Sequence, residues 1–260
     1  MKLIDVHCHL DNFFYKNDIE KIIKNCKKNN CIVIPAGITP DTNRQVLELK
    51  EKYPEIIFPT LGMYPPDALS KDKESNSNLE INYDIDEELK FIEQNADKIV
   101  GIGEVGMDGK DGIDLEKQEI IFRKTIQLAI KLEKPLVIHS RKTESKVIEI
   151  LEEYNYRKIV MHCFGGNHKL VEKIRQNQWM FSIPTNAVRD GHFQKIIKET
   201  PIHLLLTETD SPFLSPFKEQ KNEPINVIET IKIISKIKRL PIEDVANIIY
   251  RNATKTFTFN

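Results

Sequence analysis

The sequence alternates between two hydrophobic periods along almost its whole length. Short runs rich in β-branched residues, typical of buried strands, alternate with longer segments in which apolar residues recur with helical period. The expected strands are Leu3–His7, Cys31–Pro35, Ile56–Leu61, Ile99–Gly103, Leu136–His139, Ile159–His162, Trp179–Ile183 and His203–Thr207. The expected helices are Ile19–Lys28, Asp41–Lys52, Asp86–Asn95, Leu115–Leu132, Glu144–Tyr154, His168–Gln176, His192–Glu199 and Val227–Lys238, with a last helix starting near Pro241.

Eight strand–helix units fit two α/β architectures: a closed (β/α)8 barrel and an open, doubly wound sheet. Periodicity alone does not separate the two. No shift in composition marks a second domain, so residues 1–260 are expected to form a single domain. The polar stretch Ser70–Asn82, rich in Ser, Asn and Lys, is expected to be an exposed loop.

Charge and cysteine content exclude some classes of protein. The 38 Lys and Arg residues against 39 Asp and Glu give a net charge of −1, which argues against a broad basic surface for nucleic acid but allows one small phosphate site. Four unevenly spaced cysteines do not form a disulfide framework, so a reduced, cytoplasmic setting is expected, and Cys8 and Cys163 are expected to pack under helices. No membrane contact is expected, since no apolar run approaches the roughly 20 residues that span a bilayer, and the acidic start lacks a secretory signal.

Histidines and carboxylates gather where the expected strands end. They are His7 and His9 after the first strand, Glu104 after the fourth, His139 after the fifth, His162 after the sixth, and Glu208 and Asp210 after the eighth. Each residue alone has an ordinary structural explanation, such as a hydrogen-bonded core histidine or an exposed turn acid. Together they mark the face on which barrels carry their active sites. In an open sheet the first and eighth strands could not reach one site, whereas in a closed barrel they are neighbours, so this set favours the barrel.

The mixture of imidazoles and carboxylates, without a thiolate, indicates a catalytic metal site rather than a structural one. About six donors are too many for one four-coordinate ion and suit two ions that clamp a bridging water. Glu104 is the natural bridge, because a carboxylate has two ligating oxygens. The ligand set allows Zn, Mn, Mg, Co or Ni and does not choose among them.

The motifs that carry these residues resemble those of the TatD family of metal-dependent deoxyribonucleases, within the amidohydrolase-like superfamily. The matching segments, in family order from end to end of the chain, are 5–11 (DVHCHLD), 103–108 (GEVGMD), 135–141 (PLVIHSR), 162–166 (HCFGG) and 208–214 (ETDSPFL). The resemblance implies a TIM barrel that hydrolyses DNA phosphodiesters. It also implies one metal on His7, His9 and Asp210, a second on His139 and His162, and Glu104 between them.

Three departures from the family pattern lie on the substrate side. Where family members often carry a histidine in a Gly-x-His-Pro segment, this chain has Tyr64, which could stack on a base or donate a hydrogen bond. Segment 109–112 (GKDG) replaces a common aromatic pair. The late Arg-Asn-x-Pro motif becomes Lys221 and Asn222 followed by Glu-Pro, which keeps a charge but loses the bidentate fork of arginine.

A mechanism follows as a hypothesis. A metal-bound hydroxide attacks phosphorus in line, Asp210 orients the water and accepts its proton, and Glu104 bridges the metals. Arg141 is expected to grip a phosphate with its planar fork, although a salt bridge that holds the loop explains it equally well. Glu208 either supports a ligand from behind or bonds Ser140 or Arg141.

Other functions remain open. The same barrel could hydrolyse an amide, lactone or ester, with D-aminoacyl-tRNA deacylation as the main alternative. A phosphomonoesterase whose sequence opens with H-x-H is a weaker candidate, because the further ligands of that class are missing. A non-enzymatic metal-binding protein is also weaker, because the proposed ligand set is intact. Two dications against Glu104 and Asp210 leave about two positive charges at the barrel mouth. The expected partner is therefore the end of a DNA molecule or a short single strand. The expected activity is that of a 3′–5′ exonuclease. The protein is expected to be a monomer with no protein partner.

Overall fold

Eight parallel strands form one curved sheet in the order β1 to β8. The computed structural model describes residues 1–65, 83–112 and 114–259. The strands are β1 (Leu3–Cys8), β2 (Cys31–Gly37), β3 (Thr60–Met63), β4 (Gly101–Asp108), β5 (Leu136–Arg141), β6 (Ile159–His162), β7 (Met180–Ile183) and β8 (Leu205–Thr207). Each strand pairs with the next in parallel register. The prediction of a (β/α)8 barrel is therefore confirmed.

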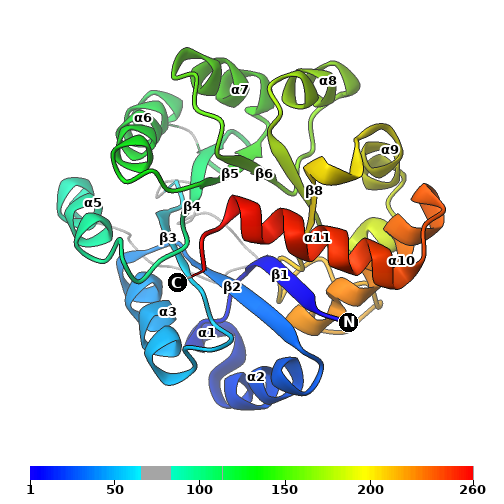
Figure 1. Ribbon diagram of the computed structural model, residues 1–260. Coiled ribbons are helices and arrows are strands. Elements are labelled where there is room, and N and C mark those ends of the chain that lie inside the picture. The colour runs from blue at the N-terminus through cyan, green and yellow to red at the C-terminus, as the bar shows by residue number, and fades with distance from the viewer. Residues whose placement is uncertain (66–82, 113, 260) are drawn as a thin grey trace.

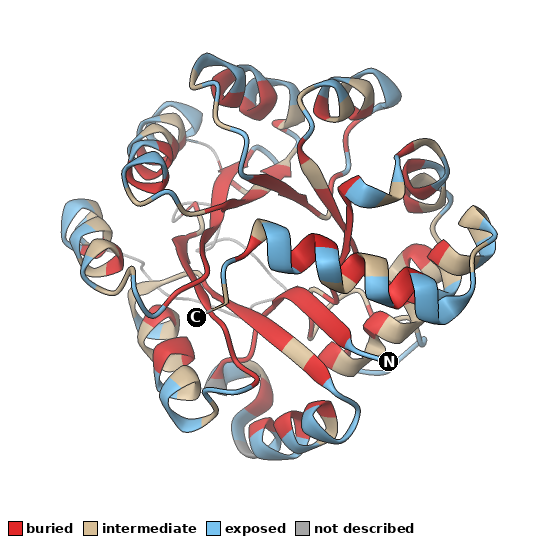
Figure 2. Ribbon diagram, viewed as in Figure 1, coloured by how far each residue is buried: buried red, intermediate tan, exposed pale blue. Residues whose placement is uncertain are grey.

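Helices surround this ring of strands (Figure 1). They are α1 (Asn12–Tyr15), α2 (Ile19–Lys28), α3 (Pro40–Lys52), α5 (Ile85–Gln94), α6 (Leu115–Lys131), α7 (Glu144–Glu153), α8 (His168–Gln176), α9 (Gly191–Glu199), α10 (Val227–Lys238) and α11 (Ile242–Thr256), with short 3₁₀ turns η1 (Lys16–Asp18), η2 (Thr185–Val188), η3 (Ile202–Leu204) and η4 (Pro224–Asn226). Figure 2 shows buried residues on the strands and on the inward helix faces, and exposed residues on the outer faces. The parallel strands are apolar on both sides because both sides are covered, as the continuous hydrophobic runs predict.

The barrel closes between β8 and β1 largely through side chains. Thr207 Oγ1 donates to Ile4 O over 2.9 Å, and Thr209 N donates to the Asp5 carboxylate over 2.9 Å. Past the end of β8, backbone hydrogen bonds join Asp210 N to His7 O (3.0 Å) and His9 N to Ser211 O (2.8 Å). These contacts bring the segment with His7 and His9 next to the segment with Asp210.

Polar residues cap the N-termini of several outer helices. The side chain of Asp84 accepts hydrogen bonds from two first-turn amides of α5, and Asn167 does the same for α8. At α3, Thr39 caps the helix and Pro40 occupies its first turn. Such residues satisfy amides that have no partner inside the helix, which explains why these helices begin where the sequence predicts.

Several strands differ from their predicted bounds. The fourth runs over Gly101–Asp108 rather than Ile99–Gly103, so Glu104 lies within the strand and not after it. The third begins at Thr60 rather than Ile56, because Pro59 has no N–H for the ladder, although an isolated bridge still joins Ile57 to Val33. The eighth begins at Leu205, because the segment after Pro201 forms the 3₁₀ turn η3. The predicted loop Ser70–Asn82 lies outside the described residues.

Helix α11 closes one mouth of the barrel. It packs against β1 and β8 and lies across the strands in Figure 1. Asn252 on this helix donates to Leu205 O over 2.9 Å, at the start of β8. The opposite mouth, where the strands end, carries the histidines and carboxylates that the sequence singles out. In the part of the chain that is described, no helix is long and apolar enough to cross a membrane.

Candidate metal centre

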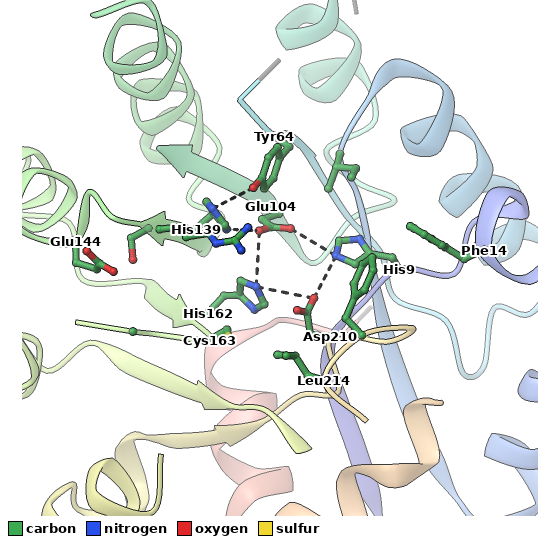
Figure 3. A pocket seen from close by; sticks show the side chains of 15 residues that line it. His9, Phe14, Tyr64, Glu104, His139, Glu144, His162, Cys163, Asp210 and Leu214 are labelled. Carbon is green, nitrogen blue, oxygen red and sulfur yellow. Dashed lines mark hydrogen bonds and ion pairs between the residues drawn. The ribbon is translucent and has the colours of Figure 1, made fainter. Parts of the chain in front are cut away.

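A cavity of about 290 Å³ opens at the carboxyl ends of the strands. Its lining includes most of the residues that the sequence singles out: His9, Tyr64, Glu104, His139, Arg141, His162 and Asp210. Figure 3 shows Glu104 at the centre of this group, with His139 and His162 on one side and His9 and Asp210 on the other. His7, from β1, lies fully buried against the same cluster.

Four ligand atoms form the first half of the cluster. The Nε2 atom of His7 lies 3.4 Å from Glu104 Oε2 and 3.5 Å from Asp210 Oδ1. The Nε2 atom of His9 lies 3.6 Å and 3.3 Å from the same two oxygens. These separations are long for hydrogen bonds. They match the roughly 3.3–3.4 Å edge of a tetrahedron of ligands about 2.0–2.1 Å from a central ion.

The second half of the cluster is less regular. Its ligand atoms are Glu104 Oε1, His139 Nδ1 at 2.8 Å and His162 Nε2 at 3.7 Å from that oxygen. Glu104 thus turns one oxygen toward each half. Three groups of side chains in the described residues could hold a metal ion, and they share these residues: His7 with His9 and Glu104, His7 with His162 and Asp210, and Glu104 with His139 and His162.

An unpaired buried nitrogen supports a metal at this place. The Nε2 atom of His7, which faces Glu104 and Asp210, has no hydrogen-bond partner among the residues described. A buried polar atom without a partner costs free energy, so such atoms need a ligand to justify them. The donor set therefore fits a divalent cation.

Carboxylates behind two histidines fix which ring nitrogen faces the cluster. Glu208 is fully buried and accepts from His162 Nδ1 over 2.9 Å and from the Cys163 amide over 3.0 Å, with Ser182 Oγ as a further donor. This leaves His162 Nε2 free to bind a metal. Carboxylate–histidine–metal arrangements of this kind orient ligands in many metal sites.

On the other side, Asp108 acts on His139. Its Oδ2 atom lies 3.0 Å from His139 Nε2 and accepts a hydrogen bond from the Tyr64 hydroxyl over 2.7 Å. Sequence reasoning did not single out Asp108. It lies four residues after Glu104 on the same strand, so the alternation of strand side chains could have revealed that both face the barrel interior.

The ionisation of the cluster follows from burial and proximity. Burial alone would raise the pKa of Glu104, but the neighbouring histidines, His162 foremost, hold it well below its usual range. Burial would also raise the pKa of Asp210, but the neighbouring histidines lower it. Burial would lower the pKa of His139, whereas Asp108 and Glu104 raise it to about 9. The carboxylates are thus ionised, and protons on the imidazoles compete with a cation.

Glycines allow the close packing around Glu104. A Cβ atom on Gly62 would lie 2.4 Å from Glu104 O, and one on Gly106, where φ is +148°, would lie 2.0 Å from His139 O. Side chains at these positions would push the second half of the cluster apart. Steric crowding around Glu104 therefore explains why Gly62 and Gly106 are glycines.

Asp5 supports the cluster indirectly and is not one of its candidate ligands. The sequence places Asp5 on the same face of β1 as His7. In the structure its carboxylate accepts hydrogen bonds from the amide and hydroxyl of Thr209, and burial raises its pKa to about 8. Asp5 thereby ties β1 to the segment that carries Asp210.

The remaining predicted site residues fall into two groups. Arg141 lines the cavity and pairs with Asp111 over 3.0 Å, and Tyr64 also lines it. Lys221 and Asn222 are not among the lining residues: Lys221 Nζ donates to Phe14 O, and Asn222 is fully buried within a hydrogen-bond network.

The structure decides one sequence expectation and corrects another. Of the two alternatives for Glu208, its carboxylate contacts the candidate ligand His162, and its bonds go neither to Ser140 nor to Arg141. Cys163 lines the cavity instead of packing under a helix, because the chain turns out of β6 there with φ +40° and its amide binds Glu208. Cys8 is fully buried in the core, as expected.

The fold and the site define a class of protein: a (β/α)8 barrel with a histidine–carboxylate cluster at the carboxyl ends of its strands, as in metal-dependent hydrolases. The family model described as TatD related DNase matches residues 4–258. The chain therefore belongs to the TatD family of metal-dependent hydrolases, enzymes that act on ester bonds.

Individual relatives agree with this assignment. An uncharacterized metal-dependent hydrolase of Methanocaldococcus jannaschii is 35% identical, over 99% of this chain and 97% of its own length. Deoxyribonuclease TATDN3 of Homo sapiens is 31% identical, over 98% of this chain and 94% of its own. The crystal structure of YjjV, a TatD homologue from Escherichia coli, superposes with a TM-score of 0.85 at 24% identity, covering 99% of this chain and 98% of that one, and supports the fold.

Proposed function

We propose that this chain is a deoxyribonuclease that hydrolyses phosphodiester bonds at the ends of DNA or in short single strands. The observation that carries the proposal is the pair of histidine–carboxylate groups that share Glu104 beside Arg141 in one cavity. The family model and the Homo sapiens relative, both described as DNases, support DNA as the substrate.

Two divalent cations per chain are part of the proposal. One would be held by His7, His9 and Asp210, the other by His139 and His162, with one oxygen of Glu104 toward each. Zn, Mn, Mg, Co and Ni all suit these ligands. Bound cations of this kind lower the pKa of a water molecule and offset the negative charge that builds up on phosphate.

The chain's own residues then perform separate tasks. Asp210 is ionised, and its side chain is 16% exposed, more than that of any other member of the cluster. We expect it to accept a hydrogen bond from the attacking water and then its proton. Arg141 also lines the cavity, and its guanidinium can exchange Asp111 for two phosphate oxygens. The Tyr64 hydroxyl contacts both His139 and Asp108 and holds them together.

The decisive experiment gives the purified, metal-loaded protein an end-labelled single-stranded oligonucleotide, the matching duplex, the RNA equivalent and a D-aminoacyl ester. The proposal expects a ladder of shortened DNA that disappears with chelator and with Glu104→Gln. Glu172→Gln, at a residue of α8 whose side chain is 43% exposed, is the matched control and retains activity. Ester hydrolysis without DNA cleavage would replace the nuclease by the deacylase alternative. Intact DNA and intact ester would reject both.

A reducing compartment such as the cytoplasm fits this proposal. All four cysteines are free thiols, and such thiols persist unpaired in reducing surroundings. Fractionation of cells followed by immunodetection tests this placement, and recovery outside the cytoplasm would contradict it.

A further inference from the structure

The cavity has two chemically different walls on either side of the histidine–carboxylate cluster. One wall is apolar and is made by Phe14, Ile38, Phe213 and Leu214. The other carries Ser140, Arg141 and Glu144. Figure 3 shows Phe14 beside His9 and Glu144 at the opposite side, with Glu104 between. The side chains of the apolar wall carry no ligand atom for a metal and no hydrogen-bond donor for a phosphate.

Two aromatic rings of this wall lie next to the cluster. The rings of Phe14 and Phe213 pack edge to face with centroids 5.2 Å apart, and the Phe213 ring lies 6.4 Å from the ring of His9. Phe213 N also donates to Asp210 O over 2.9 Å, so the turn that carries Asp210 also fixes Phe213. Both phenylalanines are only half-buried although they belong to the barrel mouth.

Lys221 and Asn222 bind the backbone carbonyls of these two phenylalanines. The Lys221 ammonium donates to Phe14 O over 2.5 Å, and the Asn222 amide donates to Phe213 O over 2.8 Å. The carbonyl of Asn222 in turn accepts from the Tyr15 hydroxyl over 2.6 Å. Two adjacent residues thus bind the two aromatic segments, which come from distant parts of the chain. Such support gives a preorganised surface rather than two loose side chains.

We propose that Phe14 and Phe213 form the binding site for an unpaired nucleobase, with Lys221 and Asn222 as positioning residues behind it. This inference rests on the proposed nuclease function and names what that function selects. Every base has an apolar π face that stacks on aromatic rings without regard to sequence. A base inside a duplex is already stacked and paired, so the wall favours single strands and frayed ends.

The placement also explains how a nearly neutral chain binds a polyanion. The base is held by apolar contact, and the charge of its phosphate is met at the cluster and by Arg141. A broad basic surface is then unnecessary, in agreement with the net charge of −1. The two residues of the altered Arg-Asn-x-Pro motif act through the aromatic wall and do not touch the substrate.

The test compares two single-stranded oligonucleotides that differ only at their terminal residues, one normal and one with abasic tetrahydrofuran residues at both ends. For the wild-type protein, we expect kcat/KM for release of the first residue to fall by about 5- to 100-fold on the abasic strand, the range that base–aromatic stacking supports. This comparison needs no variant and therefore does not depend on any variant folding.

Substitutions then locate the effect. Phe14→Leu and Phe213→Leu keep apolar volume but lose the π face, so each should lower kcat/KM on the normal strand and leave the abasic strand unchanged. Phe14→Trp should retain the preference. The matched control is Phe217→Leu, at a phenylalanine that is 43% exposed and is not one of the lining residues.

The outcomes separate the two proposals. If the wild-type protein cleaves neither oligonucleotide, the nuclease function fails. If it cleaves both equally well, the nucleobase site is refuted and the nuclease function stands. Equal losses on both strands in the leucine variants would also refute the site, because the rings would then only support packing.

Discussion

Replacing Glu208 by glutamine should weaken metal binding although Glu208 is no proposed ligand. One carboxylate oxygen accepts from His162 Nδ1 and from Ser182 Oγ, and the other accepts from the Cys163 amide. A glutamine of the same shape offers only one accepting oxygen. If that oxygen faces His162, the amide NH₂ opposes the Cys163 N–H, and a buried donor loses its partner.

The other orientation is worse for the metal. With the NH₂ group facing His162, the Nδ1 atom must accept, and the ring proton moves to Nε2, the atom that faces Glu104. Either way, the free energy of unfolding should fall by about 1–3 kcal/mol, the cost of one unsatisfied buried group. Metal affinity should fall by about 10- to 100-fold, as is typical when the partner of a ligating histidine is lost.

Calorimetric titration of the metal-free protein with Mn²⁺ or Zn²⁺ measures this effect. We expect the loss at the site that contains His162 and a smaller change at the site that contains His9. Ser182→Ala is the matched control: it removes one donor to Glu208, keeps the bonds to His162 and Cys163, and should bind metal almost as the wild type does. A folded Glu208→Gln protein with unchanged affinity at both sites would refute the reasoning.

Three further predictions follow from neighbouring contacts. Asp108→Asn removes the carboxylate beside His139 Nε2, so metal affinity should fall by roughly 10-fold or more in the same titration, and an unchanged value would contradict that role. In the metal-free protein, protonated His139 stabilises the fold in full below pH 6.5 and loses this contribution as the pH rises through about 9. The Tm of the metal-free protein should therefore fall by roughly several degrees over that interval, while the stabilisation by added metal should grow. Thermal melts with chelator and with metal at pH 6, 7.5 and 9 test both trends. Asn222→Ala leaves Thr209 O and Phe213 O without their donor and should lower the free energy of unfolding by roughly 2–4 kcal/mol in urea, whereas a loss below about 0.5 kcal/mol would show that water replaces the amide.

The sequence predicts the barrel because its signals are local. Parallel strands covered on both faces appear as apolar runs such as Ile159–Met161, and capping residues such as Asn167 mark where helices begin. Errors occur where another interaction overrides the local pattern. At Ile56–Phe58 the residues are suited to a strand, but Pro59 interrupts the ladder. At His203 the 3₁₀ turn after Pro201 delays the strand.

The cluster was predictable for a geometric reason. The carboxyl ends of all barrel strands meet at one mouth, so His7, Glu104, His139, His162 and Asp210 converge once the fold is known. What each residue contacts beyond the cluster depends on loops that have no such rule.

Residues around the cluster illustrate this limit. Lys221 and Asn222 follow a family motif, which suggested substrate contact, but their donors reach Phe14 and Phe213 instead. Asp108 was missed because its partners come from other parts of the chain: Tyr64 follows β3, and His139 lies on β5. Only the tertiary structure brings these side chains within hydrogen-bond distance.

The most direct test of the central claim is anomalous scattering from a crystal of the metal-loaded protein. The account predicts two peaks in the cavity, about 3.5–4 Å apart and on either side of the Glu104 carboxylate, one near His7 and His9 and the other near His139 and His162. A cavity without a peak, or metal bound only by residues outside this cluster, would contradict it.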